Sequence, residues 1–209
     1  MNYYFLYGVN YMFMIRFDNI SLRFPEQLIC EKLSFTIKKG EMVGLSAPSG
    51  RGKTSLLKLL MGILTSDAGK IFVNDTEVNS NSIDEIRKQI VWLPQNVNLP
   101  IESGKELTDL LELDEEGIKT YHSFLKHLGV DNNGKLFNQM SGGQRQRMIV
   151  AACLSMNKPI LVLDEPVSAL DDESIDLFIE LVQSLKDKTI ISTSHNQKWL
   201  NHCSRVIEL

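Results

Sequence analysis

Hydrophobic and polar residues alternate along the first part of the chain. The alternating segments span residues 15–24 and 32–37, and this period of two is typical of half-buried antiparallel strands. Pro25 follows the first segment, and residues 38–41 (KKGE) have the composition of a turn after the second. We therefore expect an antiparallel β subdomain near the N-terminal end.

Further along the chain, short apolar runs replace the alternation. These runs predict strands at residues 42–45, 70–73, 90–93, 159–163, 189–193 and 204–209. Segments of helical character lie between them, at residues 54–64, 83–88, 148–156 and 173–185. Strands that alternate with helices indicate the α/β class.

Residues 96–140 have a different pattern. Apolar residues recur at helical spacing, and acidic residues fill the gaps between them. The apolar positions do not continue as heptads, which argues against a coiled-coil arm. We expect a small helical subdomain at 96–140, inserted into one core that is formed by residues 14–95 and 141–209.

The first 13 residues (MNYYFLYGVNYMF) differ in composition from the rest. They contain four of the five tyrosines and no charged residue. One interpretation is that Met14 is the natural start, so that residues 1–13 lie upstream of the protein. The other is an N-terminal extension that docks on a partner, because an exposed aromatic run favours association.

The composition of the chain narrows the function classes. With 43% hydrophobic residues and a net charge of −4, it has material for a core but no basic field to attract nucleic acid. Cys30, Cys153 and Cys203 are widely spaced, so they match no metal or disulfide pattern and indicate a reducing compartment. No apolar run approaches the roughly 20 residues that a membrane span requires. We expect a protein that is soluble or held to a membrane by partners.

The strongest chemical signal follows the strand at 42–45. A loop of mostly small residues leads into a helix, in the order Ala47-Pro48-Ser49-Gly50-Arg51-Gly52-Lys53-Thr54-Ser55. A helix N-terminus leaves backbone N–H groups unpaired and carries about half a positive charge. Glycines let such a backbone approach an anion closely. The order predicts a phosphate-binding loop in which Lys53 reaches the phosphates and Thr54 ligates Mg²⁺.

Ala47 departs from the pattern G-x-x-x-x-G-K-[ST], which has glycine at this position. If the position requires a positive φ, alanine adds about 1–2 kcal/mol of strain. If φ is negative, the methyl group costs little. Taken alone, the loop also fits an ordinary strand–turn–helix in a glycine-rich stretch.

Other chemically capable side chains stand just beyond predicted strands. Asp164 and Glu165 directly follow one strand, while Gln95 and His195 each come two residues after another. Ligands of open α/β sheets bind beyond the carboxyl ends of the strands, so these side chains are candidate site residues. His195 also fits an ordinary turn histidine.

The sequence SGGQ precedes the predicted helix at 148–156. Ser141 and Gln144 match a capping box, which is a purely structural role. Gly142 and Gly143 are not required for capping, and they would let a second anion approach this helix end.

Asp171 and Phe24 also have two interpretations each. Asp171 precedes the helix at 173–185 and is suited to cap it. Phe24 ends a predicted strand upstream of the phosphate loop, where it could stack on a base or be an ordinary core or edge aromatic.

Taken together and in this order, the motifs resemble the nucleotide-binding domain of ATP-binding cassette (ABC) proteins over residues 14–209. The resemblance implies a P-loop NTPase (RecA-like) α/β core with an N-terminal antiparallel β subdomain and an inserted α-helical subdomain. It also implies an Mg²⁺-dependent ATPase whose ligands are ATP and Mg²⁺.

The resemblance gives each motif a role. Residues 47–54 match the Walker A loop and residues 160–164 the Walker B strand. Nucleotide binding is implied for Phe24, Ala47, Pro48, Ser49, Gly50, Arg51, Gly52, Lys53, Thr54 and Ser55. Metal binding is implied for Thr54, Gln95 and Asp164. Catalytic roles are implied for Glu165 as general base, His195 as the switch histidine at the γ-phosphate, and Gln95 as the Q-loop residue.

The resemblance also implies head-to-tail dimers. The resemblance implies that residues 140–144 are the signature motif, and that Asp171 belongs to the D-loop. The signature residues that would face the ATP of the opposite chain are Ser141, Gly142, Gly143 and Gln144. The partner would be a second cassette, in a homodimer or heterodimer.

Three further positions depart from the family pattern. Met140 replaces leucine, which is a near-isosteric apolar change. Asn196 replaces the usual acid after the histidine, and Arg51 stands where a small residue is more usual.

Three functions are consistent with this reading. The favoured one is the ATPase subunit of a bacterial ABC transporter, peripheral on the cytoplasmic face of the membrane and driving a separate permease that docks on the helical insert. The alternative is a non-transport ABC ATPase of the cell-division or metal-cluster-assembly type. The third is a nucleotide-binding switch that barely hydrolyses, which only Ala47 suggests. No nucleic-acid partner is expected.

Overall fold

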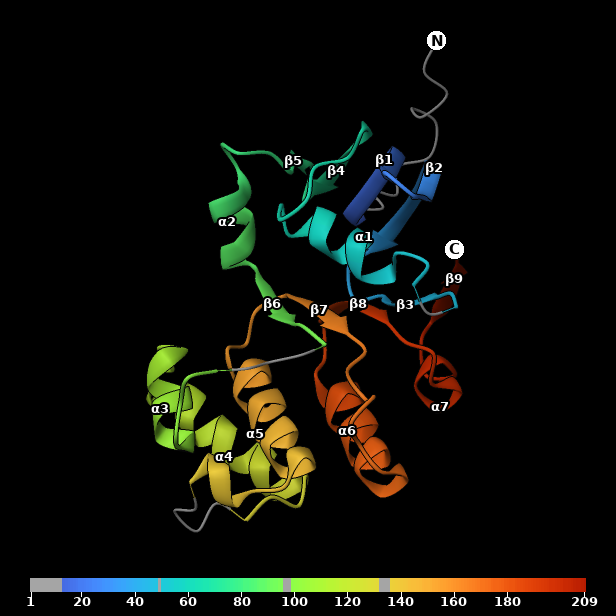
Figure 1. The fold of residues 1–209 in the computed structure, drawn as a ribbon. Coiled ribbons are helices and arrows are strands. Elements are labelled where there is room, and N and C mark those ends of the chain that lie inside the picture. Colours follow the sequence, from blue (N-terminus) through green and yellow to red (C-terminus); the bar gives the residue numbers. More distant parts are fainter. Residues whose placement is uncertain (1–12, 49, 96–98, 132–135) are drawn as a thin grey trace.

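The computed structural model describes residues 13–48, 50–95, 99–131 and 136–209. An antiparallel and a parallel β-sheet lie one above the other with a helix between them, and further helices cover the other face of the parallel sheet (Figure 1). The α/β class, the antiparallel β subdomain and the inserted helices are thereby confirmed.

The antiparallel sheet has four strands in the order β2-β1-β4-β5. Their bounds are Phe13–Phe24 (β1), Gln27–Lys38 (β2), Ala68–Val73 (β4) and Thr76–Glu77 (β5). Asn74 and Asp75 have positive φ, 46° and 60°, and make the tight turn between β4 and β5. The sequence pattern did not predict β5, because two residues are too short to show a period.

The parallel sheet has five strands in the order β6-β7-β8-β3-β9. Their bounds are Met42–Ser46 (β3), Ile90–Leu93 (β6), Ile160–Asp164 (β7), Thr189–Thr193 (β8) and Arg205–Glu208 (β9). Thr193 pairs with Leu45 on one side and with Asp164 on the other. The carboxyl ends of β3, β7 and β8 therefore lie side by side at one edge of the sheet.

Helix α1 (Lys53–Leu60) lies between the two sheets (Figure 1). Its leucines at positions 56, 57, 59 and 60 belong to a core that also contains Ile15 of β1 and Val162 of β7. This helix was predicted to continue to residue 64, but it ends earlier because Gly62 adopts a φ of +62°. The Ile63 N–H donates to the Lys58 carbonyl at 2.8 Å, which completes a Schellman C-terminus.

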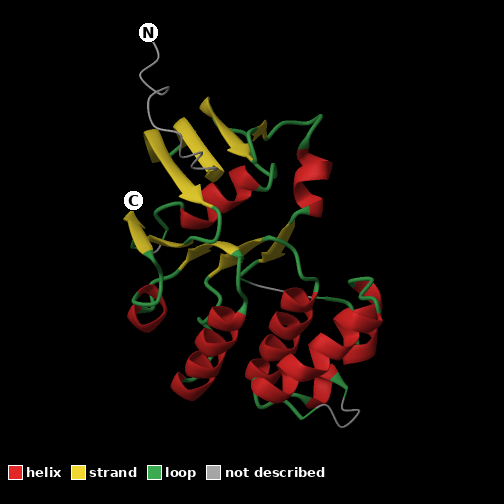
Figure 2. Ribbon diagram, turned by 180° about the vertical axis from the view of Figure 1, so that it is seen from behind, coloured by secondary structure: helices red, strands yellow, loops and turns green. Residues whose placement is uncertain are grey.

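Helices cover the other face of the parallel sheet (Figure 2). They are α5 (Gly142–Ser155), α6 (Asp172–Ser184) and α7 (Gln197–Leu200), while α2 (Ile83–Lys88) leads into β6. Helix α7 was not predicted. Asn196 accepts a hydrogen bond from the Trp199 N–H at 3.1 Å and so caps α7, which gives the asparagine at this position a structural role.

The helical insert lies at one end of the molecule, beyond β6 (Figure 1). It comprises α3 (Gly104–Leu110), α4 (Glu115–His127) and the 3₁₀ helix η1 (Phe137–Gln139). Tyr121 and Leu125 of α4 are buried in one core with Met148 of α5. The domain limits at 96–140 and 141–209 stay predictions. Within the described ranges, none of the helices combines the length and apolar character that crossing a bilayer requires.

Candidate functional site

A cavity of about 590 Å³ opens at the edge where β3, β7 and β8 end. It gathers most of the residues that the sequence predicted as nucleotide-binding or catalytic. Its lining residues are Phe24, Gln27, Ile29, Ala47, Pro48, Gly50, Arg51, Gly52, Lys53, Thr54, Ser55, Gln95, Glu165 and His195. Ser49, also predicted here, lies outside the described residues.

Two of the lining residues were not predicted from the sequence. Gln27 Nε2 donates to the carbonyl of Gly50 at 2.6 Å. Ile29 packs against Gly52, where a Cβ atom would approach Ile29 Cγ2 to 2.3 Å. Both belong to β2, so the antiparallel sheet supports the loop between β3 and α1 from outside.

The loop has the backbone that its glycines suggest. Gly50 and Gly52 have φ values of +77° and +88°, which side-chain-bearing residues rarely adopt. Ala47 is not among the residues with positive φ. The alanine is therefore unstrained at this position, which answers the question that the sequence left open.

Helix α1 begins without a side-chain cap. Its N-cap residue is Gly52, which has no side chain to accept a hydrogen bond from the first backbone N–H groups. These donors and the positive end of the helix dipole face a cavity that also contains Lys53. Such an arrangement suits a phosphate group.

Lys53 is almost fully buried, with 8% of its surface exposed. Its Nζ donates to the carbonyl of Ala47 at 2.7 Å and lies 3.6 Å from Glu165 Oε1. A buried ammonium group needs such partners. These contacts hold Lys53 beside the glycine loop, where it was predicted to bind the phosphates of a ligand.

Asp164 is the last residue of β7, and only 2% of its surface is exposed. Its Oδ1 accepts hydrogen bonds from Thr54 Oγ1 at 3.0 Å and from Thr193 Oγ1 at 2.6 Å. Thr54 and Asp164, predicted from separate motifs, are therefore direct neighbours. Hydroxyl and carboxylate oxygens are hard donors of the kind that Mg²⁺ prefers, and Mg²⁺ usually shares its remaining positions with waters and phosphates.

Glu165 has an unusual backbone for a residue with a side chain, with a φ of +50°. Its carboxylate is buried, and Oε2 lies 3.0 Å from His195 Nδ1, at ion-pair distance. No donor in the described residues has hydrogen-bond geometry toward this Oε2. A buried carboxylate oxygen that receives no hydrogen bond from the protein is suited to accept a hydrogen bond from a water in the cavity.

The signature residues lie elsewhere in the chain. Ser141 Oγ accepts from the Gln144 N–H at 3.2 Å, and Gln144 Oε1 accepts from the Ser141 N–H at 3.0 Å, so the predicted capping box is present at the start of α5. Ser141, Gly142, Gly143 and Gln144 do not line the cavity that contains Lys53. One copy of the described chain therefore does not bring them to the phosphate loop.

Asp171 is the N-cap of α6. Its Oδ1 accepts from the Ser174 N–H at 2.8 Å, and hydrogen bonds from Ser174 hold the pKa of Asp171 below its ordinary value, with help from the nearby charge of Arg147. The structural interpretation of Asp171 is thus confirmed, and its role as a D-loop residue stays a prediction.

Gln95 lines two cavities. Besides the site, it borders a groove of about 600 Å³ between the core and the helical insert. The groove is lined by Gln95, Leu99, Ile101, Phe137, Asn138, Gly142, Arg145, Gln146, Ile149 and Ala169. A single side chain thus stands between the candidate site and a surface of the insert.

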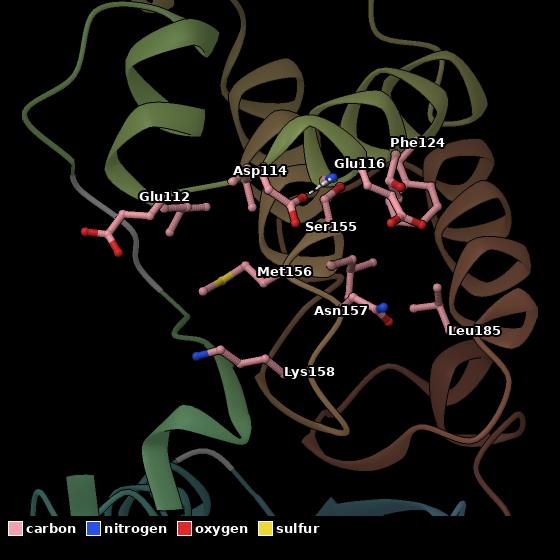
Figure 3. A pocket seen from close by; sticks show the side chains of 14 residues that line it. Glu112, Asp114, Glu116, Phe124, Ser155, Met156, Asn157, Lys158 and Leu185 are labelled. Carbon is pink, nitrogen blue, oxygen red and sulfur yellow. Dashed lines mark hydrogen bonds between the residues drawn. The ribbon is translucent and has the colours of Figure 1, made fainter. Parts of the chain in front are cut away.

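A larger cavity, of about 710 Å³, lies where α4 meets the C-terminal ends of α5 and α6 (Figure 3). It contains none of the predicted site residues. Asp114 uses Oδ1 to cap α4 through the Gly117 N–H at 2.8 Å, and Lys158 Nζ donates to the Arg87 and Ile90 carbonyls. The Glu112 side chain extends away from the other labelled residues (Figure 3). The polar groups of this larger cavity do not converge on one point, so the size of a cavity does not identify the functional site.

The described residues contain no group of three or more His, Cys, Asp or Glu side chains that would cage a metal by themselves. The oxygens of Thr54 and Asp164 instead fit a metal that is shared with a phosphate ligand.

Comparison with known proteins gives the same picture. The family model described as ABC transporter matches residues 30–168. The chain is 32% identical over 211 residues to an energy-coupling factor transporter ATP-binding protein of Oenococcus oeni, covering 95% of this chain and 76% of the relative. It is 35% identical over 175 residues to the thiamine import ATP-binding protein of Escherichia coli, covering 79% and 75%.

Solved structures show the same fold. A dimeric ATP-binding cassette in a post-hydrolysis state with ADP and Pi matches with a TM-score of 0.81 and 23% identity over 94% of both chains. An ATP-binding subunit of an ABC transporter matches with a TM-score of 0.83 and 21% identity, covering 94% of this chain and 85% of that one.

Proposed function

The chain belongs to the ABC transporter family and is an ATP-hydrolysing subunit of such a transporter, and from this premise we propose how its residues carry out the reaction. The observation that carries the proposal is the convergence of Lys53, Glu165 and His195 on one cavity beside the glycine loop. The adjacent Asp164–Thr54 pair supplies the oxygen donors for Mg²⁺.

We propose that ATP binds with its phosphates at the start of α1. The backbone N–H groups of the loop, from Gly50 onward, and the ammonium group of Lys53 bind the phosphate oxygens. Phe24, which is 37% exposed at the cavity wall, stacks on the base. When bound, Mg²⁺ neutralises charge on the phosphates, and Thr54, Asp164 and Gln95 are the residues that hold it.

In this proposal Glu165 is the general base. Glu165 lines the same cavity as Lys53, and its buried Oε2 receives no hydrogen bond in the described chain, so we assign to this carboxylate the proton of a water aligned with the terminal phosphate. His195 Nδ1 lies 3.0 Å from that oxygen, at ion-pair distance, and in this proposal the histidine contributes a donor toward the phosphate. Phosphoryl transfer needs mainly positioning and charge neutralisation, and these groups provide both.

The separation of the signature residues from Lys53 supports a site that two chains complete. We propose that a second cassette places its Ser141, Gly142 and Gly143 against the phosphates, so that ATP closes the dimer and hydrolysis opens it. The start of α5 is a suitable anion site, because two glycines begin the helix and a Cβ atom at Gly142 would meet nothing within 4 Å. The D-loop residue Asp171 would lie at the same dimer contact.

We further propose that a separate membrane permease docks in the groove between the core and the helical insert. Apolar side chains such as Leu99 and Ile101 line it, and Gln95 joins it to the ATP site, so a movement of the permease reaches the reacting groups through one residue. The protein would then be peripheral on the cytoplasmic face of the membrane.

The relatives favour transport over the other two functions. Their names describe energy coupling and the import of methionine, zinc or thiamine, which supports an importer rather than the cell-division or metal-cluster alternative. Because these cargoes differ, we propose that the permease selects the cargo. The hypothesis of a nucleotide-binding switch that barely hydrolyses ATP rested only on Ala47, and it loses that support because Ala47 is unstrained.

Two measurements test the proposal together. Phosphate release from ATP by the purified chain should require Mg²⁺, and the chain tagged in its native cell should co-purify with a membrane protein. Hydrolysis without a membrane partner would support the non-transport alternative, and co-purification without hydrolysis would support the switch.

A further inference from the structure

We propose that Thr193, the last residue of β8, is a positioning residue of the ATPase site. Its buried hydroxyl holds the carboxylate of Asp164 and the backbone of Glu165 at the same time. The inference rests on the proposed roles of these two acids, and it gives a function to a residue that contacts neither phosphate nor metal in that proposal.

The hydrogen bonds of the hydroxyl fix its direction. Thr193 Oγ1 donates to Asp164 Oδ1 at 2.6 Å and accepts from the Glu165 N–H at 3.0 Å. A hydroxyl has one proton to donate, so the donor is committed to Asp164. Thr193 is 0% exposed, which means that no solvent replaces this donor if the hydroxyl is removed.

For Asp164, the Thr193 hydroxyl is one of two donors to the same carboxylate oxygen. Thr54 Oγ1 also donates to Asp164 Oδ1, at 3.0 Å, and Thr54 is the residue that the proposed function assigns to Mg²⁺. Thr54 can bind the metal through an oxygen lone pair and still donate its proton, so Thr193 is a second donor on the same carboxylate oxygen, and one that takes no part in metal binding. Donors behind a metal-binding carboxylate typically change metal affinity or activity 10- to 100-fold when they are removed.

For Glu165 the hydroxyl supports an uncommon backbone. The Glu165 N–H lies 3.1 Å from the Thr193 carbonyl oxygen and 3.0 Å from Thr193 Oγ1, so one donor is shared between two acceptors of the same residue. Glu165 has a φ of +50°, a conformation that persists in folded proteins only where the surroundings hold it. Thr193 therefore helps to keep the general base in place.

The sequence of β8 supplies a matched control. Thr189 begins the same strand, is also 0% exposed, and accepts a hydrogen bond through Oγ1 from the Gly40 N–H at 2.9 Å. Valine has the shape of threonine and equal suitability for a strand, but it cannot form these hydrogen bonds. Thr193→Val and Thr189→Val thus make the same chemical change at opposite ends of one buried strand.

The experiment compares the wild type, Thr193→Val, Thr193→Ser and Thr189→Val. For Thr193→Val we expect kcat to fall about 10- to 100-fold. The KM for ATP should change less than about threefold, because the phosphate loop is untouched. The Mg²⁺ concentration for half-maximal rate should rise. Thr193→Ser, which keeps the hydroxyl, should recover most of the rate, and Thr189→Val should match the wild type.

A binding measurement without turnover completes the test. The rise in Tm given by a non-hydrolysable ATP analogue with Mg²⁺, minus the rise with EDTA, should shrink for Thr193→Val and persist for Thr189→Val. Equal kcat, Mg²⁺ requirement and Tm increment in the two valine variants would overturn the inference. If Thr193→Val does not fold, Thr193→Ala measured against Thr189→Ala gives the same comparison. A wild type that does not hydrolyse ATP would overturn the proposed function itself.

Discussion

Lys53 Nζ lies 3.6 Å from Glu165 Oε1, and both side chains are more than nine-tenths buried. A buried positive group and a buried negative group at this distance stabilise each other, because neither is well solvated. The two residues come from different elements, α1 and the end of β7, so the parallel sheet itself brings them together. The pair places the proposed general base directly beside the proposed phosphate-binding lysine.

The first prediction concerns Glu165→Gln. Glutamine keeps the size of the side chain but cannot take a proton from water, so kcat should fall about 10²- to 10⁴-fold. ATP binding should remain, and an ATP-bound dimer should accumulate, which gel filtration detects. Glu85→Gln, an exposed acid on α2 paired with Lys88, is the matched control and should leave kcat unchanged. Unchanged turnover in Glu165→Gln would remove Glu165 from the proposed role.

The second prediction compares the two glycines of the loop. Gly50→Ala and Gly52→Ala both place a methyl group at positive φ, which costs about 1–2 kcal/mol. At Gly52 the new Cβ also meets Ile29 Cγ2 at 2.3 Å, whereas at Gly50 it meets nothing within 4 Å. Gly52→Ala should therefore lower Tm more and raise the KM for ATP more.

The control for this comparison is the double variant Ile29→Ala with Gly52→Ala. It should recover part of the lost ATP affinity, because the contact is relieved while the backbone strain remains. Equal effects of Gly50→Ala and Gly52→Ala on Tm and KM would show that Ile29 does not restrict the loop.

The third prediction is that Ala47→Gly, which restores the common loop pattern, brings no gain. Because Ala47 lacks a positive φ, kcat should stay within about twofold of the wild type. The free energy of unfolding should fall by about 0.4–1 kcal/mol, because glycine gives the unfolded chain more freedom. Urea denaturation and phosphate release measure the two effects. A large rise in kcat would mean that alanine restrains the loop after all.

The fourth prediction tests the groove beside Gln95. Ile101 is half-buried in it and packs against the core around α5. Ile101→Glu should reduce co-purification with a membrane subunit about tenfold or more, because it puts a charge into an apolar contact. The hydrolysis rate of the purified chain should change less than about twofold. Loss of hydrolysis together with loss of the partner would indicate damage to the fold rather than to a docking surface.

Some residues of the candidate site could be predicted from the sequence, and others could not. Asp164, Glu165 and His195 could be predicted, because charged or titratable residues stand out at or just beyond the ends of buried apolar strands. The phosphate loop could be predicted because glycines, a lysine and a threonine occur in a fixed order with a stated physical reason. Contacts between neighbouring strands then follow from the topology.

Gln27, Ile29 and Thr193 could not be predicted in the same way. They are ordinary strand residues, and their roles come from neighbours distant in the sequence, such as Gly50, Gly52 and Asp164. For Thr193 a weak signal was present, because a hydroxyl in a buried strand must find a partner. The sequence does not say which partner, and that information exists only once β8 lies beside β7.

The last prediction separates the two roles of Ser141. Its Oγ caps α5, and in the proposed dimer the same residue faces the phosphates of the opposite chain. Aspartate caps a helix as well as serine does, so Ser141→Asp should keep Tm close to that of the wild type. Its negative charge would repel the phosphates, so ATP-dependent dimerisation and hydrolysis should be lost. Ser141→Asn, which also caps without adding charge, is the control and should retain dimerisation at least in part. If Ser141→Asp dimerises with ATP and hydrolyses it normally, Ser141 only caps the helix, and the proposal of a site completed by two chains is wrong.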